Sequence, residues 1–267
     1  QPARAGQFYP NSPDALAAAV DAHLAAGGHE GKAKQACRAL LLPHGMWRDC
    51  GDGIGTTLAQ VHVPAHGIIL GPKHTHLGPD LSVASHQRWA YPGSSVPIET
   101  HLAHRLLDLM PGFYLESEAH RLEHSAEVLV PFLHRAQPNL SIVRVVICGR
   151  TPFDIALSIG DALATLIAEQ PTPPLLVISS DLNHHATGDD TDTLDQLAMT
   201  ALQSGDPRHL YDTCRENRIQ MCGLMSAVAT LHALQQSGTP IDATITDYHT
   251  STTQPSRIVG YASVVLR

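Results

Sequence analysis

The sequence predicts an α/β fold in a single domain spanning residues 1–267, with a mixed or largely parallel central sheet and helices on both faces. The first observation behind this prediction is the alternation of short apolar runs with helical patterns between residues 37 and 235. The second is composition. Of the 267 residues 43% are hydrophobic and only 16% are charged, which is enough apolar material for one large core.

The helices are predicted from capping residues, apolar periodicity and glycine or proline boundaries. In the first helix, residues 11–14 supply an N-cap candidate and a first-turn proline, and Leu16, Val20 and Leu24 share one face. We expect helices at residues 11–27, 52–60, 100–110, 152–169, 189–203, 207–216 and 224–235.

The strands are predicted from short apolar or alternating runs bounded by turn residues. We expect strands at residues 37–42, 67–71, 113–116, 142–148, 175–180, 241–248 and 258–266. Residues 77–97 are rich in Gly, Pro and Ser, and such a long irregular stretch in a compact domain is usually a functional loop.

Polar residues follow three of the predicted strands. His44 comes after the first strand and His74 after the second, and the strand at 175–180 is followed by Asp181 and His184. Because the carboxyl ends of parallel neighbouring strands lie along one edge of a sheet, we expect these side chains to converge on one crevice. One such histidine alone would be an ordinary polar residue at a strand end.

A second group of candidates lies between residues 120 and 127. Helical spacing would place His120, Glu123, His124 and Glu127 on one face, either as a site or as a solvated polar face. Residues 120–124 also fit His-x-x-Glu-His, the inverted zinc-peptidase motif, in which both histidines bind zinc and the glutamate activates water. Pro131 argues against this peptidase, because it limits the helix to little more than two turns.

Histidine is enriched in this chain. There are 18 histidines against 17 lysines and arginines together, which raises the expectation of metal or acid-base chemistry. Two imidazoles and one thiolate can form a three-ligand site that leaves positions open, and this donor set permits zinc, copper(I) or iron(II). Asp181 and His184 fit the orienting acid and the proton-transfer partner beside such a metal.

The five cysteines contain no Cys-x-x-Cys spacing, so neither a disulfide framework nor a structural zinc knuckle is expected. Cys222 lies at the opening of the predicted helix 224–235, whose start would lower the pKa of a thiol placed there. A buried, inert cysteine is the commoner alternative.

The charge balance excludes several classes of partner. The net charge is −8 and the pI is about 6.1, and no cluster of Lys and Arg could neutralise a row of phosphates, so nucleic acid is not expected. We find no signal peptide and no apolar run of membrane-spanning length, and we therefore expect a cytoplasmic protein that does not bind membranes. The expected partner is a small molecule or a protein.

The chain resembles the Memo family, the AmmeMemoRadiSam system protein B group of bacteria and archaea, over nearly its whole length. The matching stretches, in order, are residues 4–10 (RAGQFYP), 43–47 (PHGMW), 70–74 (LGPKH), 123–127 (EHSAE) with 131–133 (PFL), 179–184 (SSDLNH) and 222–223 (CG).

The resemblance implies a fold similar to the class III extradiol ring-cleaving dioxygenases, which use non-haem iron(II). It implies that His44, His74 and Cys222 bind one metal ion, Fe(II) before Cu or Zn. Asp181, His184 and His124 are then expected around the open coordination positions, with His184 or His124 as the acid-base residue.

The expected activity is an oxygenase-type reaction on a small aromatic or otherwise chelating substrate, which could be anionic. The alternative is a non-catalytic scaffold that binds a metal or a peptide, since animal members are discussed as signalling proteins; the zinc peptidase ranks below both. The resemblance also implies a functional link to a radical SAM protein and an AMMECR1-like protein.

Several positions depart from the usual family pattern. Gly45 and Met46 stand where Ala-Gly is common, Lys73 replaces a usual Ser, and His185-Ala186 replace an aromatic residue and Gly. These residues flank the expected ligands, so the departures concern the substrate. Lys73 in particular could hold an anionic substrate.

Overall fold

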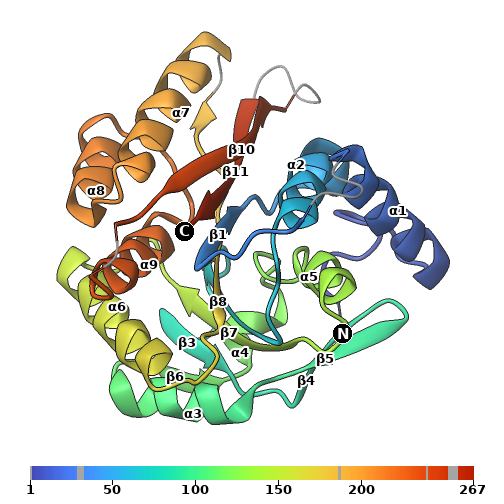
Figure 1. Cartoon of the computed structure of the whole chain (residues 1–267), viewed down its shortest axis with the longest axis horizontal. Helices are drawn as coiled ribbons and strands as arrows, with labels where there is room; N and C mark the ends of the chain where they lie inside the picture. The colour runs from blue at the N-terminus through green and yellow to red at the C-terminus, as the bar shows by residue number, and fades with distance from the viewer. Residues whose placement is uncertain (1, 29–32, 186–187, 239, 252–257) are drawn as a thin grey trace.

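A nine-stranded mixed sheet forms the centre of the structure, a computed structural model that describes residues 2–28, 33–185, 188–238, 240–251 and 258–267 (Figure 1). In sheet order the strands are β10 (Ala243–Thr250), β11 (Ile258–Leu266), β1 (Ala39–Leu42), β8 (Leu175–Ser179), β2 (His66–Pro72), β7 (Ser141–Ile147), β3 (Leu81–Ala84) and β6 (Tyr114–Glu116), with β9 (His184–His185) paired to β11.

The four central strands, β1, β8, β2 and β7, are parallel. On one side of them β11 is antiparallel to β1, and on the other β3 is antiparallel to β7, so the sheet is mixed with a parallel centre, as predicted. Strands that are buried on both faces need apolar residues at every position, which explains the continuous apolar runs in the sequence.

The helices cover both faces of the sheet (Figure 1). They are α1 (Pro13–Ala26), α2 (Trp47–Gln60), α3 (Thr100–Leu109), α4 (Glu118–Arg121), α5 (Val130–Ala136), α6 (Phe153–Ala168), α7 (Gly188–Gln203), α8 (Pro207–Glu216) and α9 (Leu224–Gln235). Apolar residues of α1, α2 and α5 pack in one core with Leu40 and Val177. Those of α3, α6, α8 and α9 pack in the other core with Leu41 and Ile178, because successive residues of a strand point to opposite faces.

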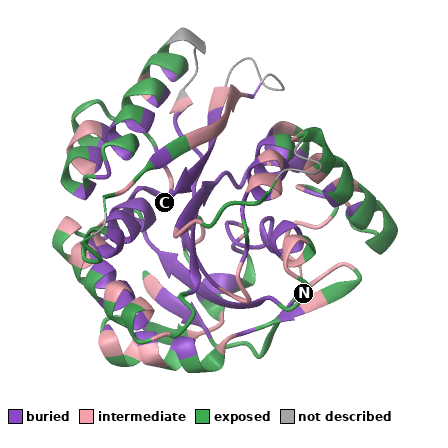
Figure 2. Ribbon diagram, viewed as in Figure 1, coloured by how far each residue is buried: buried purple, intermediate pink, exposed green. Residues whose placement is uncertain are grey.

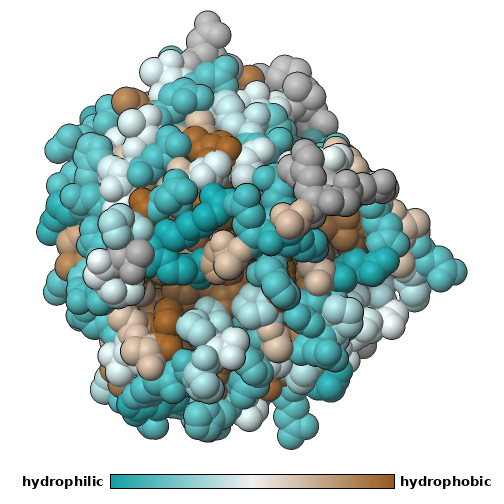
Figure 3. Space-filling view, viewed as in Figure 1, coloured by the Kyte–Doolittle hydropathy of each residue, from teal (hydrophilic) through white to brown (hydrophobic). Residues whose placement is uncertain are grey.

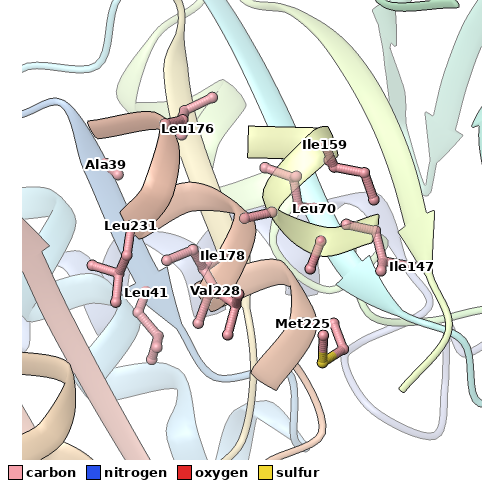
Figure 4. Close-up of a cluster of buried hydrophobic side chains, with 14 of the residues drawn as sticks. Ala39, Leu41, Leu70, Ile147, Ile159, Leu176, Ile178, Met225, Val228 and Leu231 are labelled. Atoms are coloured by element: carbon pink, nitrogen blue, oxygen red, sulfur yellow. The ribbon is translucent and has the colours of Figure 1, made fainter. Parts of the chain in front are cut away.

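The second core is the larger of the two. Figure 4 shows Leu41, Ile178 and Leu70 of three adjacent strands beneath Val228 and Leu231 of α9. Nearly all of α9 is buried, as the purple ribbon in Figure 2 shows, because α9 lies between the sheet, α6 and α8. This explains why its sequence is apolar all round rather than along one stripe.

The outer surface seen in Figure 3 is mostly polar, in contrast to the apolar cores. This face has hydrophobic atoms in a hollow near its middle. Among the described residues, none of the helices combines the length and apolar character needed to cross a bilayer.

Most predicted elements are present with shifted ends, but the loop predicted at residues 77–97 is wrong. This stretch contains β3 and a hairpin of β4 (Arg88–Tyr91) and β5 (Ser94–Pro97). Gly93, at a φ of +82°, makes the turn of the hairpin, and Trp89 and Val96 point into the core. Strands of four residues contain too few alternations to stand out from a Gly/Pro/Ser-rich background.

Residues 120–127 do not form the continuous helix that would place their polar side chains on one face. Helix α4 ends at Arg121, and a series of turns leads from there to the start of α5 at Val130. His120, Glu123 and Glu127 therefore do not share a helix face.

The start of α2 also differs from the prediction. Helix α2 begins at Trp47, five residues before the predicted start at residue 52. Its internal glycines had indicated a later start.

We expect Gly55→Ala to destabilise the fold. A Cβ at this position would lie 2.1 Å from the carbonyl oxygen of His23, so α1 would have to move away from α2. We expect a loss of about 1–3 kcal/mol in the free energy of unfolding, measured by urea denaturation, despite the better helix propensity of alanine. Gly149→Ala, where an added Cβ would meet open space, is the control. Equal stability of both variants would contradict the close approach of α1 and α2.

Candidate metal centre

The candidate site lies at the carboxyl ends of the parallel strands. His44, His74 and Asp181 follow β1, β2 and β8, as predicted from the three strand ends, and His184 is held in β9 beside Val259 of β11. They open onto a cavity of about 290 Å³. Its described lining residues are Phe8, His44, Met46, Arg48, Asp49, His74, His124, Asp181, His184, Ser251, Val259 and Tyr261.

Two overlapping groups of side chains could hold a metal ion here. The ligand atoms of His44, His74 and His124 all lie within 4.8 Å of one another, and so do those of His44, Asp181 and Cys222. The predicted ligands His44, His74 and Cys222 are thus divided between the two groups, which share His44. The residues fit a metal ion, and the exact ligand set stays a prediction.

The orientation of His44 is fixed by Ser179, which was not among the predicted site residues. The Ser179 hydroxyl donates its hydrogen to the Ser125 carbonyl and lies 2.7 Å from Nδ1 of His44. Because that hydroxyl hydrogen is already used, Ser179 must accept a hydrogen from Nδ1. The lone pair of His44 is therefore on Nε2, which lies 3.2 Å from Sγ of Cys222.

Glu123 orients His74 in the same way. Its carboxylate accepts Nδ1–H of His74 at 2.9 Å, the His74 backbone N–H at 2.6 Å and the Ser125 backbone N–H at 2.9 Å. Burial alone would raise the pKa of Glu123, but the hydrogen bond from His74 and the neighbouring His74, His124 and Arg144 lower it below its usual range. An ionised Glu123 leaves Nε2 of His74 as the ligand atom.

Burial disfavours the charged forms of His44 and His124. It lowers the pKa of His44 well below its ordinary value and that of His124 to about 3, with neighbouring histidines adding to the effect. Nδ1 of His124 is buried, lies 3.5 Å from Glu123 and has no hydrogen-bond partner among the residues that the structure describes. Neutral imidazoles can bind a metal without first losing a proton.

Cys222 differs from its prediction. It precedes α9, but burial and then the charge of Asp181 raise the pKa of its thiol rather than lowering it. The Asp181 backbone N–H donates to Sγ at 3.1 Å, and burial also raises the pKa of the Asp181 carboxyl. A bound ion would have to displace the proton from this thiol.

Arg144 supports the site from within the core. It is fully buried on β7 and donates to the backbone carbonyls of His120 and Glu123, at 3.3 and 2.8 Å, with its guanidinium 4.2 Å from the Trp89 ring centroid. Arg144 was not among the predicted site residues, although one arginine inside an otherwise apolar strand is a signal. Buried charges are retained only where they have partners.

The first described residues of the chain form one wall of the site. Glu127 is buried and accepts hydrogen bonds from this segment: the backbone N–H groups of Ala3 and Arg4, at 2.7 and 2.8 Å, and the hydroxyl of Tyr9 at 2.8 Å. Phe8, in the same segment, lies with its ring centroid 4.7 Å from that of His124.

The inverted zinc-peptidase motif does not form a site. The His120 side chain is buried with Nε2 3.1 Å from the Ser82 hydroxyl, and it belongs to neither metal-ligand group found among the described residues. Glu123 accepts the hydrogen of His74 Nδ1, as described above, so its carboxylate is engaged by a histidine outside the motif. The structure thus offers no support for the peptidase interpretation.

The departures from the family pattern lie at different distances from the cavity. Met46 lines it, whereas Lys73 is turned away: its ammonium donates to the Gly78 carbonyl at 2.5 Å and to Asp80 at 3.3 Å. Lys73 is therefore not placed to hold a substrate. Ala186 and the side chain of His185 lie outside the described residues.

A larger hollow, of about 750 Å³, lies at the opposite edge of the sheet, where the parallel strands begin. Most of its lining is apolar, with residues before β1, β2 and β8 and at the ends of α6 and α9. It contains neither of the ligand groups found among the described residues, so we place the chemistry at the smaller cavity.

Comparison with known proteins agrees with the sequence motifs. A family described as "Memo-like protein" matches residues 1–265. The chain belongs to the Memo family. A MEMO1 family protein of Aquifex aeolicus is 29% identical over 269 residues, which cover 99% of this Memo chain and 98% of that protein. Another, of Thermotoga maritima, is 30% identical over 281 residues, covering 100% and 99%.

A solved structure supports the fold. The crystal structure of an uncharacterized protein of Escherichia coli K12 matches this Memo chain with a TM-score of 0.56 at 18% identity, covering 85% of this chain and 98% of that one. At this identity the similarity extends to the fold alone. It is consistent with the α/β architecture expected of the Memo and extradiol dioxygenase-like folds.

We expect Glu123→Gln to weaken metal binding. A glutamine can still accept a hydrogen bond from His74, but it has no charge to hold the imidazole and one oxygen fewer for the backbone N–H groups. The affinity for Fe(II) or Zn(II), measured by anaerobic chelator competition, should fall roughly 10–100-fold. Glu118→Gln, on the exposed side of α4, is the control. An unchanged affinity would contradict the orienting role of Glu123.

We expect stability to depend on pH through Asp195. This residue is buried and accepts hydrogen bonds from the Asn183 N–H and the Tyr248 hydroxyl, and burial raises its pKa to about 7. Because the unfolded pKa is about 4, the folded protein binds more protons between these values, and this stabilisation is lost as pH rises through 7.

Asp195→Asn should therefore gain roughly 2–3 kcal/mol relative to the unsubstituted protein between pH 5 and pH 8. Urea denaturation at both pH values measures the difference, with exposed Asp154→Asn as control. A difference that does not change with pH would show that Asp195 is ionised throughout.

Proposed function

We propose that this Memo-family protein is a non-haem Fe(II) enzyme that carries out an oxygenase-type reaction on a small aromatic or otherwise metal-chelating substrate. The observation that carries the proposal is the convergence of several histidines and a carboxylate on one open cavity, with the Cys222 thiol 3.2 Å from Nε2 of His44. Catalytic metal sites keep positions open for substrate, whereas structural sites are usually closed by four protein ligands.

The donor set supports iron. His44, His74 and Cys222 offer two imidazoles and a thiolate, a donor set that Fe(II) accepts, and the carboxylate of Asp181 lies within 4.8 Å of the ligand atoms of His44 and Cys222. When bound, Fe(II) would relay electrons to dioxygen from the chelated substrate, which is the net reductant. Ser179 and Glu123 keep Nε2 of both imidazoles directed at the site before any ion arrives.

The cavity supports a small substrate. Its volume of about 290 Å³ is at the lower end of ligand pockets and suits one ring. Phe8 and Tyr261 provide aromatic walls, and the Tyr261 ring takes the room that a side chain at Gly45 would need, because a Cβ there would lie 2.6 Å from it. A chelating aromatic compound must lose a hydroxyl proton on binding. The low pKa of His124 makes it a weak base, so we assign this proton to His184.

Metal analysis of anaerobically purified protein tests the ligand set. We expect about one iron per chain, lost in His44→Ala and in Cys222→Ala because each removes a donor atom. His104→Ala, an exposed position on α3, should keep its iron. Unchanged metal content in both site variants would contradict the assignment.

Oxygen uptake tests the reaction. Iron-reconstituted protein should consume oxygen with catechols or related chelators, and His184→Ala should lower the rate by roughly 10²- to 10⁴-fold, the usual contribution of a general base. A fully metallated protein that stays inactive with every chelator would instead favour the scaffold interpretation.

A further inference from the structure

The charged residues around the cavity narrow the substrate class, and this inference rests on the function proposed above. The described residues that line the cavity include one permanently charged cation, Arg48, which lies in the first turn of α2. The remaining polar lining consists of imidazoles, two carboxylates and two hydroxyls. A permanent cation on one side of a small site gives any bound ring a preferred direction.

Arg48 is available to a ligand. Its side chain is 62% exposed, and its ion-pair contact is with Asp49, whose Oδ2 lies 3.8 Å from Nε, beyond hydrogen-bond distance. No hydrogen bond of its guanidinium is present within the described part of the chain. The Asp49 side chain is only 9% exposed. Its carboxylate is therefore buried, whereas the Arg48 guanidinium lies at the solvent-exposed edge of the cavity.

The helix that carries Arg48 adds to the positive potential. Helix α2 begins at Trp47 with Met46 as its N-cap, and no side chain caps its first N–H groups. The first turn borders the cavity through Met46, Arg48 and Asp49. The N-terminal end of a helix favours anions, although Asp49 offsets part of this effect.

The other nearby cations are engaged elsewhere. The Lys73 ammonium is held by Gly78 and Asp80, as described above, and its side chain is only 6% exposed. Arg4 lies behind the Phe8 wall, with its guanidinium carbon 5.8 Å from the Phe8 ring centroid, and it is not among the described residues that line the cavity.

We infer that the substrate carries an anionic group, such as a carboxylate, on the side of the ring remote from its chelating atoms, and that Arg48 binds this group. Arg48 is thus the residue that selects carboxylated ring compounds. A guanidinium suits this task because its parallel N–H groups match the two oxygens of a carboxylate.

Three catechols that differ only in a short side chain test the inference by calorimetry with anaerobic, metal-loaded protein. They are 3,4-dihydroxyphenylacetate (anionic), 4-ethylcatechol (neutral) and dopamine (cationic). We expect the anionic probe to bind about five- to tenfold more tightly than the neutral one, since part of the attraction is screened by solvent. Dopamine should bind most weakly.

Substitutions of Arg48 test whether this residue causes the preference for the anionic catechol. Arg48→Gln should remove the preference for the anionic probe and leave the affinity for 4-ethylcatechol unchanged, which also shows that the variant is folded. Arg48→Lys should keep part of the preference, and Arg48→Glu should reverse it in favour of dopamine. Arg135→Gln is the matched control, because Arg135 is 58% exposed and pairs with Asp21 far along the chain.

The outcomes separate this inference from the proposed function. If all three catechols bind equally to the unsubstituted protein, or if Arg48→Gln keeps the preference, Arg48 is not the selecting residue, while the chelating site stands. If none of the catechols binds the metal-loaded protein, the proposed function fails and this inference fails with it.

Discussion

The segment between α4 and α5 has no regular structure, yet it supplies Glu123 and His124 to the site and Glu127 to the wall beside it. The buried guanidinium of Arg144 holds this segment, because it donates to backbone carbonyls that no helix or strand would satisfy. A neutral residue of similar shape would leave these carbonyls without a donor, at a free-energy cost of about 1–3 kcal/mol each. The position of the orienting carboxylate therefore depends on one strand of the central sheet.

Much of the fold could be predicted because its strands are buried on both faces and read as unbroken apolar runs. The carboxyl-end placement of His44, His74 and Asp181 followed from the same pattern, since parallel strands share an edge. The short strands β3, β4 and β5 could not be recognised, because four residues give little periodicity and β4 and β5 depend on packing of Trp89 and Val96. Tertiary contacts decided these elements.

The candidate site likewise has one part that could be predicted from the sequence and one part that depends on tertiary contacts. Residues at strand ends are visible in a sequence, whereas the groups that orient them come from distant positions: Ser179 is 135 residues from His44, and Glu123 is 49 residues from His74. The pKa of Cys222 was predicted in the wrong direction for a similar reason. A helix start is visible in the sequence, but the burial and the neighbouring Asp181 that outweigh it are not.

The hydrogen bonds between residues 3–9 and Glu127 determine how the chain can be shortened or extended without changing the cavity. Phe8 covers His124, so a fragment that started at α1 would keep every expected metal ligand and yet lack a wall of the cavity. The three hydrogen bonds to one carboxylate also make the position of this segment sensitive to what is fused in front of it. A change in this segment would therefore act on a wall of the cavity, whereas β11 runs antiparallel to β1 and ends at the opposite edge of the sheet.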